Sequence, residues 1–205
     1  VGGVYSRSIR KSELQKSKTL SDFIEGYPAN WISAYISVEV SGENNGLKTS
    51  LWSKSDVLSG EQIKMLTDLG IGAEVVVKVK YNTKNIITNA LEESEMNVSL
   101  TIIPEVEAGY IGGYENMIAY LKENSSDKIA MIVDKGVEPS VLRFSIDKTG
   151  KADDIKLIKK SGSIEVDNLL IELIENMPKW SPAKNLKGES VSQQFNFRVG
   201  KMDGC

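Results

Sequence analysis

Histidine is absent from the 205-residue sequence, and cysteine occurs once. A chain without histidine has no Ser-His-Asp triad, no Cys-His nucleophile pair and no His-ligated zinc, and a single thiol excludes cages of thiolates. Catalysis would have to rest on carboxylates, lysine or tyrosine. We therefore expect a protein that is not an enzyme and that uses no cofactor and no metal. Cys205 is the one cysteine and has no partner for an internal disulfide, so its thiol is either free or intermolecular.

Long apolar runs are also missing, and none approaches the roughly 20 residues that a membrane-spanning helix needs. The chain begins with Val1 rather than methionine, which is compatible with a signal peptide, a lipoprotein anchor or a transmembrane segment ahead of it. The 25 basic and 28 acidic residues give a net charge of -3. Nucleic acid binding needs a basic surface. We therefore expect no nucleic acid partner and no membrane span within the chain.

The clearest periodic pattern is an amphipathic helix in the last quarter of the chain. Its apolar side chains recur at i, i+3, i+4, i+7, i+8 and i+11, which places them in one stripe. They are Val166, Leu169, Leu170, Leu173, Ile174 and Met177. Pro178 lacks the N–H that a helix interior needs and disfavours helical geometry in the residue before it, so we expect the helix to stop at Met177. Residues 141–146 and 155–160 before it, and 191–199 after it, alternate apolar and polar as strands do.

A series of motifs surrounds this helix. Residues 142–151 (LRFSIDKTGK) make a strand and turn, and Ser161, Gly162 and Asp167 open the helix. The run Met177-Pro178-Lys-Trp180-Ser-Pro182 closes it before residues 191–197 (VSQQFNF), and residues 107–121 upstream form a glycine turn followed by a helix. In this order the motifs resemble the C-terminal domain of TonB, the periplasmic end of bacterial energy transducers, in the form common among Bacteroidetes.

The resemblance implies an α+β fold for residues 105–205, with a helix packed on a small antiparallel sheet. It also implies a role, which is to bind a short extended segment of an outer-membrane or cell-envelope partner by strand addition. The expected location is the periplasm or the cell surface, after export. If the chain is anchored upstream, this binding serves energy transduction to outer-membrane transport.

The residues of the predicted site follow from the alternation in the last strand and from the motif around the helix. The side chains that face away from the helix and are expected to contact the partner are Ser192, Gln194, Asn196 and Arg198. Those expected to face the helix are Val191, Gln193, Phe195, Phe197 and Val199. A structural role is expected for Asp167, Met177, Pro178, Trp180 and Pro182, with Trp180 packed over the helix end.

The first half of the chain predicts a β-rich, sandwich-like domain over residues 26–104 with one short helix. Residues 34–40 alternate as a strand and pair with residues 47–52 in a hairpin. Ser59 and Gln62 form a capping box for the helix, which is expected to end at Gly70 or Gly72. Strands are expected at 75–81 and 96–102, joined by a polar loop at 82–93. Residues 59–66 and 72–79 carry a weaker resemblance to the C-terminal β domains of gliding-motility protein M of Bacteroidetes.

Residues 1–25 are expected to be a separate N-terminal arm. They are polar and locally basic, and Ile9, Leu14 and Leu20 are too sparse to form a core face. Such an arm becomes ordered by lying on its own body or on a neighbour, for example as a strand added to an open sheet edge. This suggests an alternative function, an exported structural subunit that self-assembles into a filament through its N-terminal arm.

Overall fold

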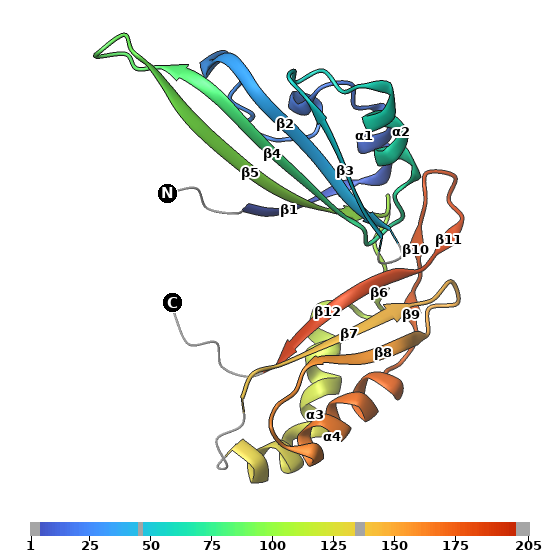
Figure 1. Ribbon diagram of the computed structural model, residues 1–205. Coiled ribbons are helices and arrows are strands. Elements are labelled where there is room, and N and C mark those ends of the chain that lie inside the picture. The colour runs from blue at the N-terminus through green and yellow to red at the C-terminus, as the bar shows by residue number, and fades with distance from the viewer. Residues whose placement is uncertain (1–4, 45–46, 134–137, 200–205) are drawn as a thin grey trace. The chain divides into compact units, whose positions relative to one another are not determined.

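The computed structural model describes residues 5–44, 47–133 and 138–199 and has an α+β fold, as predicted (Figure 1). The chain divides into two compact units, Val1–Ile103 and Pro104–Cys205. We call them the N-terminal unit and the C-terminal unit. Each has its own hydrophobic core.

The N-terminal unit is built on one five-stranded sheet with strand order β1-β5-β4-β2-β3. Its strands are β1 (Tyr5–Arg10), β2 (Ile32–Asn44), β3 (Leu47–Ser53), β4 (Glu74–Lys84) and β5 (Leu91–Ile103). β1 runs parallel to β5, and the other pairs are antiparallel. The alternation predicted for β4 is confirmed, because Val75, Val77 and Val79 are all fully buried.

Helices, and not a second sheet, cover the apolar face. They are α1 (Lys11–Lys16), α2 (Gly60–Asp68) and the 3-10 turn η1 (Leu20–Asp22), whereas a second 3-10 turn, η2 (Ala29–Trp31), has no buried residue. Within residues 5–44 and 47–103 no second sheet faces the first, so the predicted sandwich is not found. The capping box of α2 is confirmed, since Gln62 N donates to Ser59 Oγ at 3.2 Å and Ser59 N donates to Gln62 Oε1 at 2.9 Å.

The N-terminal segment is part of this unit, and the prediction of a separate arm is wrong. Ile9, Leu14 and Leu20 are at most 5% exposed and lie in the core. Lys11 Nζ donates to the Thr67 carbonyl at 2.6 Å and to the Leu69 carbonyl, and so caps the C-terminal end of α2. The segment passes through a strand, a helix and a 3-10 turn within twenty residues. No single period therefore relates its apolar side chains, although all of them reach one core.

The β4–β5 hairpin is longer than the sequence indicated. Residues 82–93 were expected to be a polar loop, but β4 continues to Lys84 and pairs it with Leu91, which leaves a loop of residues 85–90. Figure 1 shows this hairpin extending past the neighbouring strands. Its side chains are mostly exposed on both faces, and a strand without a buried face has no apolar alternation to reveal it.

The C-terminal unit has a three-stranded antiparallel sheet with order β12-β7-β8. Its longer elements are α3 (Gly113–Val133), β7 (Ser140–Ile146), β8 (Ala152–Lys159), α4 (Ile164–Glu175) and β12 (Gln193–Val199). Short strands complete it: β6 (Gly109–Tyr110) pairs with β9 (Trp180–Ser181), and β10 (Ala183–Lys184) pairs with β11 (Ser190–Val191).

Helix α4 packs on the sheet through the predicted stripe. All six stripe residues, from Val166 to Met177, are at most 8% exposed. The helix ends at Glu175, two residues before the predicted stop, with Asn176 as its C-cap. Helix α3 lies beside α4, and the Tyr120 hydroxyl donates to the Leu173 carbonyl of α4 at 3.0 Å.

Removing residues 1–24 is expected to unfold the N-terminal unit. The deletion removes Ile9, Leu14, Leu20, Phe23 and Ile24 from the core. At about 1.5–3 kcal/mol for each buried side chain, the loss is comparable to a typical total stability of about 5–15 kcal/mol. Amide dispersion in a two-dimensional NMR spectrum measures the effect, with the signals of the C-terminal unit as an internal control. A truncated chain that keeps both sets of dispersed signals would show that the segment is dispensable.

Candidate functional site

The outer edge of β12 is the most regular unpaired strand edge of the C-terminal unit. β12 pairs with β7 along all seven of its residues, from Gln193 opposite Ile146 to Val199 opposite Ser140, without a register shift. Its other side has no partner strand among the described residues. An edge of this kind presents a row of N–H and C=O groups that another chain can pair with.

The side chains of β12 alternate between solvent and core. Gln194, Asn196 and Arg198 are exposed, as is Ser192 just before the strand. On the other face Gln193 is buried, and the apolar side chains of Phe195, Phe197 and Val199 are half-buried and pack against the core. Asn196 also accepts a hydrogen bond at 3.4 Å from Arg143 Nε on β7. These residues therefore lie where the alternation placed them, while their contact with a partner stays a prediction.

The opposite edge of the same sheet, β8, is irregular and charged. Its pairing with β7 shifts register twice, between Val141 and Leu142 and between Arg143 and Ser145. Asp154 has a positive φ of 50° and forms an ion pair with Lys156 at 2.7 Å. Bulges and charged side chains are the features by which edge strands avoid pairing with other chains. β8 is therefore protected, and β12 is not.

An aromatic cluster holds β12 on its core side. Trp180 is buried, and its ring centroid lies 5.3 Å from that of Phe195 on β12, 6.2 Å from Phe144 on β7 and 5.6 Å from Tyr110 on β6. Phe144 and Phe195 stack at 5.7 Å. The Trp180 Nε1–H donates to Met177 Sδ at 3.2 Å. Met177 and Trp180 thus have the structural role that the sequence predicted, with Trp180 packed over the end of α4.

The remaining motif residues lie at the two ends of α4 and in the segment that follows it. Asp167 is buried, and its Oδ1 accepts a hydrogen bond at 2.9 Å from Ser161 N, which fastens the preceding turn to the first turn of the helix. The backbone N–H of Met177 donates to Ile174 O at 3.2 Å, the last helical turn before Pro178. Pro182 separates the short strands β9 and β10.

A buried amide, predicted to face inward but without assigned partners, fixes the start of β12. Gln193 is 5% exposed, and its Oε1 accepts a hydrogen bond at 2.7 Å from Ala108 N. Its Nε2 donates to Glu107 Oε2 at 2.8 Å. Glu107 and Ala108 are therefore bound to the start of β12, and Val106 pairs with Lys184. The signal in the sequence was a glutamine at an inward position of an alternating strand.

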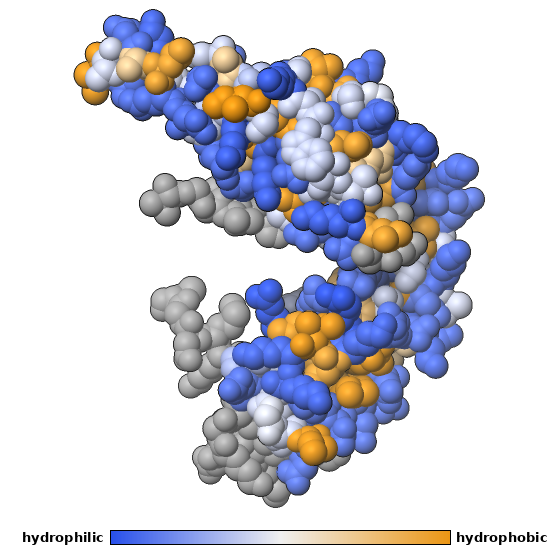
Figure 2. All heavy atoms as spheres, in the orientation of Figure 1, coloured by the Kyte–Doolittle hydropathy of each residue, from blue (hydrophilic) through white to orange (hydrophobic). Residues whose placement is uncertain are grey.

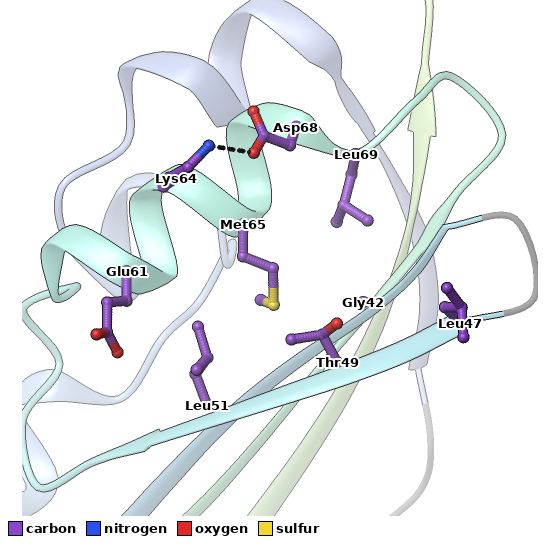
Figure 3. Close-up of a pocket in the computed structure, with 9 residues that line it drawn as sticks. All are labelled: Gly42, Leu47, Thr49, Leu51, Glu61, Lys64, Met65, Asp68 and Leu69. Atoms are coloured by element: carbon purple, nitrogen blue, oxygen red, sulfur yellow. Dashed lines mark hydrogen bonds and ion pairs between the residues drawn. The ribbon is translucent and has the colours of Figure 1, made fainter.

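A separate pocket lies in the N-terminal unit between β3 and α2 (Figure 3). Its volume is about 350 Å³, and it is lined by Gly42, Leu47, Thr49, Leu51, Glu61, Lys64, Met65, Asp68 and Leu69. A Cβ at Gly42 would lie 2.6 Å from Leu69 Cδ1, so the glycine lets the helix approach the sheet. At the rim Lys64 Nζ donates to Asp68 Oδ2 at 2.7 Å, and this hydrogen bond raises the pKa of the Lys64 ammonium.

Comparison of the chain with protein-family models, with curated proteins and with solved structures finds no match. In the described part of the chain, no group of three or more His, Cys, Asp or Glu side chains is arranged to hold a metal ion. No helix among the same residues combines the length and the apolar character needed to cross a bilayer.

Gly150 next to the aromatic cluster is expected to tolerate no side chain. Its φ is +84°, its carbonyl accepts a hydrogen bond at 2.7 Å from Trp180 N, and a Cβ there would lie 1.9 Å from Trp180 O. Gly188 has a similar φ of +78° but nothing within 4 Å of the Cβ position, so it serves as the matched control. We expect Gly150→Ala to lower the free energy of unfolding by about 1–3 kcal/mol more than Gly188→Ala, because both strain φ but only one creates an overlap.

Urea unfolding of the two variants, followed by near-ultraviolet circular dichroism and by hydrogen exchange in the C-terminal unit, measures this difference. Equal losses in the two variants would mean that the overlap between a Cβ at residue 150 and Trp180 is relieved at no cost.

Proposed function

We propose that the C-terminal unit is a non-enzymatic protein-binding module that takes an extended segment of its partner as an added strand along β12. The observation that carries the proposal is the contrast between the two edges of one sheet. β8 is interrupted by two register shifts and by charge, whereas β12 is regular over its whole length. Main-chain hydrogen bonds along such an edge supply affinity with little dependence on the sequence of the partner.

The side chains along β12 define the segment that it would accept. On the core side an added strand would meet the half-buried Phe197 and Val199, which favours apolar residues at alternate positions. On the other side it would meet Gln194, Asn196 and Arg198. Arg198 has no ion pair among the described residues, so an acidic residue on that side of the segment would gain a charge-assisted contact.

The resemblance to the TonB C-terminal domain supports a cell-envelope setting for this binding. The partner is then an outer-membrane or other envelope protein, reached in the periplasm or at the cell surface after export. An anchor upstream of the chain would allow the bound strand to transmit force, as energy transduction to outer-membrane transport requires. The resemblance and the regular β12 edge come from independent observations, the first from motifs and the second from strand pairing.

The alternative, a filament subunit joined through its N-terminal arm, has less support. Residues 5–10 already occupy the edge of their own sheet as β1, with Ile9 in the core. Donating this strand to a neighbour would first remove it from its own unit.

Strand addition can be tested by modifying the backbone of a bound peptide. Peptides that bind the full chain are selected from a displayed random library, and the best is resynthesised with N-methyl groups on one alternate set of amides or on the other. We expect methylation of one set to weaken binding by about tenfold or more and methylation of the other to be tolerated, because alternate N–H groups of an edge strand point toward its neighbour. Hydrogen exchange should show protection in β12 and none in β8.

A matched pair of charge-reversal variants tests whether the peptide binds at β12. Arg198→Glu on β12 is expected to weaken peptides that carry an acidic residue, while Lys160→Glu just after β8 makes the same charge change and leaves binding as it was. Peptides that bind equally with either set of amides methylated, or that protect another part of the chain, would exclude strand addition at β12.

A further inference from the structure

The end of the β4–β5 hairpin exposes two isoleucines almost completely. Ile86 is 96% exposed and Ile87 is 91% exposed, and Leu91 beside them is 63% exposed. Figure 2 shows hydrophobic residues gathered at the projecting end of this hairpin. Side chains of this type are mostly found inside folded proteins. We call residues 85–91 the hairpin tip.

The hairpin tip is held in one conformation by its own hydrogen bonds. Asn85 N donates to Ala90 O and Asn89 N donates to Asn85 O, each at 2.9 Å. The Asn85 side chain accepts from Ile87 N at 2.9 Å and from Thr88 N at 3.1 Å, and it donates to Glu92 Oε1 at 2.7 Å. The two isoleucines are therefore presented outward by an ordered loop, which reduces the entropy lost when they bind.

The same unit contains a cavity suited to such side chains, the pocket between β3 and α2. Its floor is apolar, formed by Leu51, Met65 and Leu69, and the Leu69 side chain packs against Gly42 where a Cβ would stand (Figure 3). The volume of about 350 Å³ is more than twice that of an apolar cavity of about 150 Å³ known to hold a benzene ring. A branched aliphatic side chain therefore fits.

The tip and the pocket of one molecule cannot meet. Val75 on β4 lies opposite Gly42 of the pocket, and Lys84, nine residues later on the same strand, lies at the base of the tip. At about 3.3 Å for each residue, the two sites are about 30 Å apart at opposite ends of one sheet. Any contact between them joins two molecules.

We propose that the chain associates with further copies of itself head to tail, the hairpin tip of one molecule inserting Ile86 and Ile87 into the β3–α2 pocket of the next. The contact uses different patches on the two molecules, so a bound pair still offers one free tip and one free pocket. Such heterologous contacts give open chains or rings instead of a closed dimer. This inference concerns the N-terminal unit and does not depend on the function proposed for β12.

Two side chains of opposite charge can meet in this contact. Lys84 at the base of the tip and Glu61 at the pocket carry opposite charges, and neither forms an ion pair in the described part of the chain. A lipid surface is the other occupant that an apolar tip could have. Binding to anionic lipids draws on clustered lysine and arginine, whereas Glu92 and Glu93 outnumber Lys84 beside the tip. The observations therefore favour a protein pocket.

The test is the mass of the full chain in solution, measured by sedimentation from micromolar to millimolar concentration in the presence of a reductant that keeps Cys205 as a thiol. The wild-type mass is expected to rise with concentration. Ile86→Asp/Ile87→Asp removes the tip, and Thr49→Phe fills the pocket from an exposed strand position opposite Gly42. Each is expected to lower the association constant by about tenfold or more. Leu47→Asp, at a lining residue that is 77% exposed, is a second pocket variant should Thr49→Phe fail to fold.

Mixing the two variants distinguishes a contact between tip and pocket from other contacts between molecules. The tip variant retains a pocket and the Thr49→Phe variant retains a tip, so an equimolar mixture should form a heterodimer and nothing larger. Ile164→Asp is the matched control, an isoleucine to aspartate change at a residue that is 79% exposed in the first turn of α4, where a negative charge is favourable. It should associate like the wild type.

Three results would overturn the proposal. The first is a wild-type chain that stays monomeric at millimolar concentration. The second is a Thr49→Phe chain that associates normally while the tip variant does not, which would indicate contact between two tips. The third is binding of the tip to vesicles of neutral or anionic phospholipid without any self-association.

Discussion

Unpaired main-chain groups at the edges of the sheets are the constraint that organises both units. An open sheet always has two edges, and each must be covered, interrupted or used. In the N-terminal unit β1 forms one edge, and its arginines pair with acidic side chains that follow it, Arg7 with Glu25 at 3.1 Å and Arg10 with Glu13 at 3.6 Å. In the C-terminal unit β8 is interrupted by bulges. The regular edges that remain are β12 and β3. We propose that β12 takes an added strand, and β3 lines the pocket for which we propose the hairpin tip of another copy.

The rigidity of β12 originates in the core beneath it. Phe195 stacks on Phe144 and touches Trp180, whose backbone is fastened to Gly150, while Gln193 fastens the start of the strand to residues 107–108. A strand fixed at several points keeps its outer N–H and C=O groups in register before a partner arrives. Less conformational entropy is then lost on binding, which is how a short peptide segment can gain useful affinity from main-chain hydrogen bonds alone.

Sequence patterns predicted the segments that have one buried face and the local start of a helix. The stripe of α4, the alternation of β4 and β12 and the capping box at Ser59 all belong to this class, because each depends on neighbours close in sequence. The N-terminal segment was misjudged because it changes conformation every few residues, and the hairpin tip because neither of its faces is buried. The β3–α2 pocket depends on Gly42 meeting Leu69, a contact between residues far apart in sequence. The candidate edge residues were named correctly as exposed, but which edge is regular became visible only in the pairing registers.

The two proposed contacts rest on different forces and use different units of the chain. Strand addition at β12 relies on main-chain hydrogen bonds and tolerates many sequences, whereas the tip and pocket rely on burying two particular side chains. In a head-to-tail array every copy would carry its own β12 edge. Partner segments attached to one surface would then meet many edges at once. Repeated weak contacts raise the overall affinity far above that of one edge, so a module that holds each segment loosely would still hold a surface firmly.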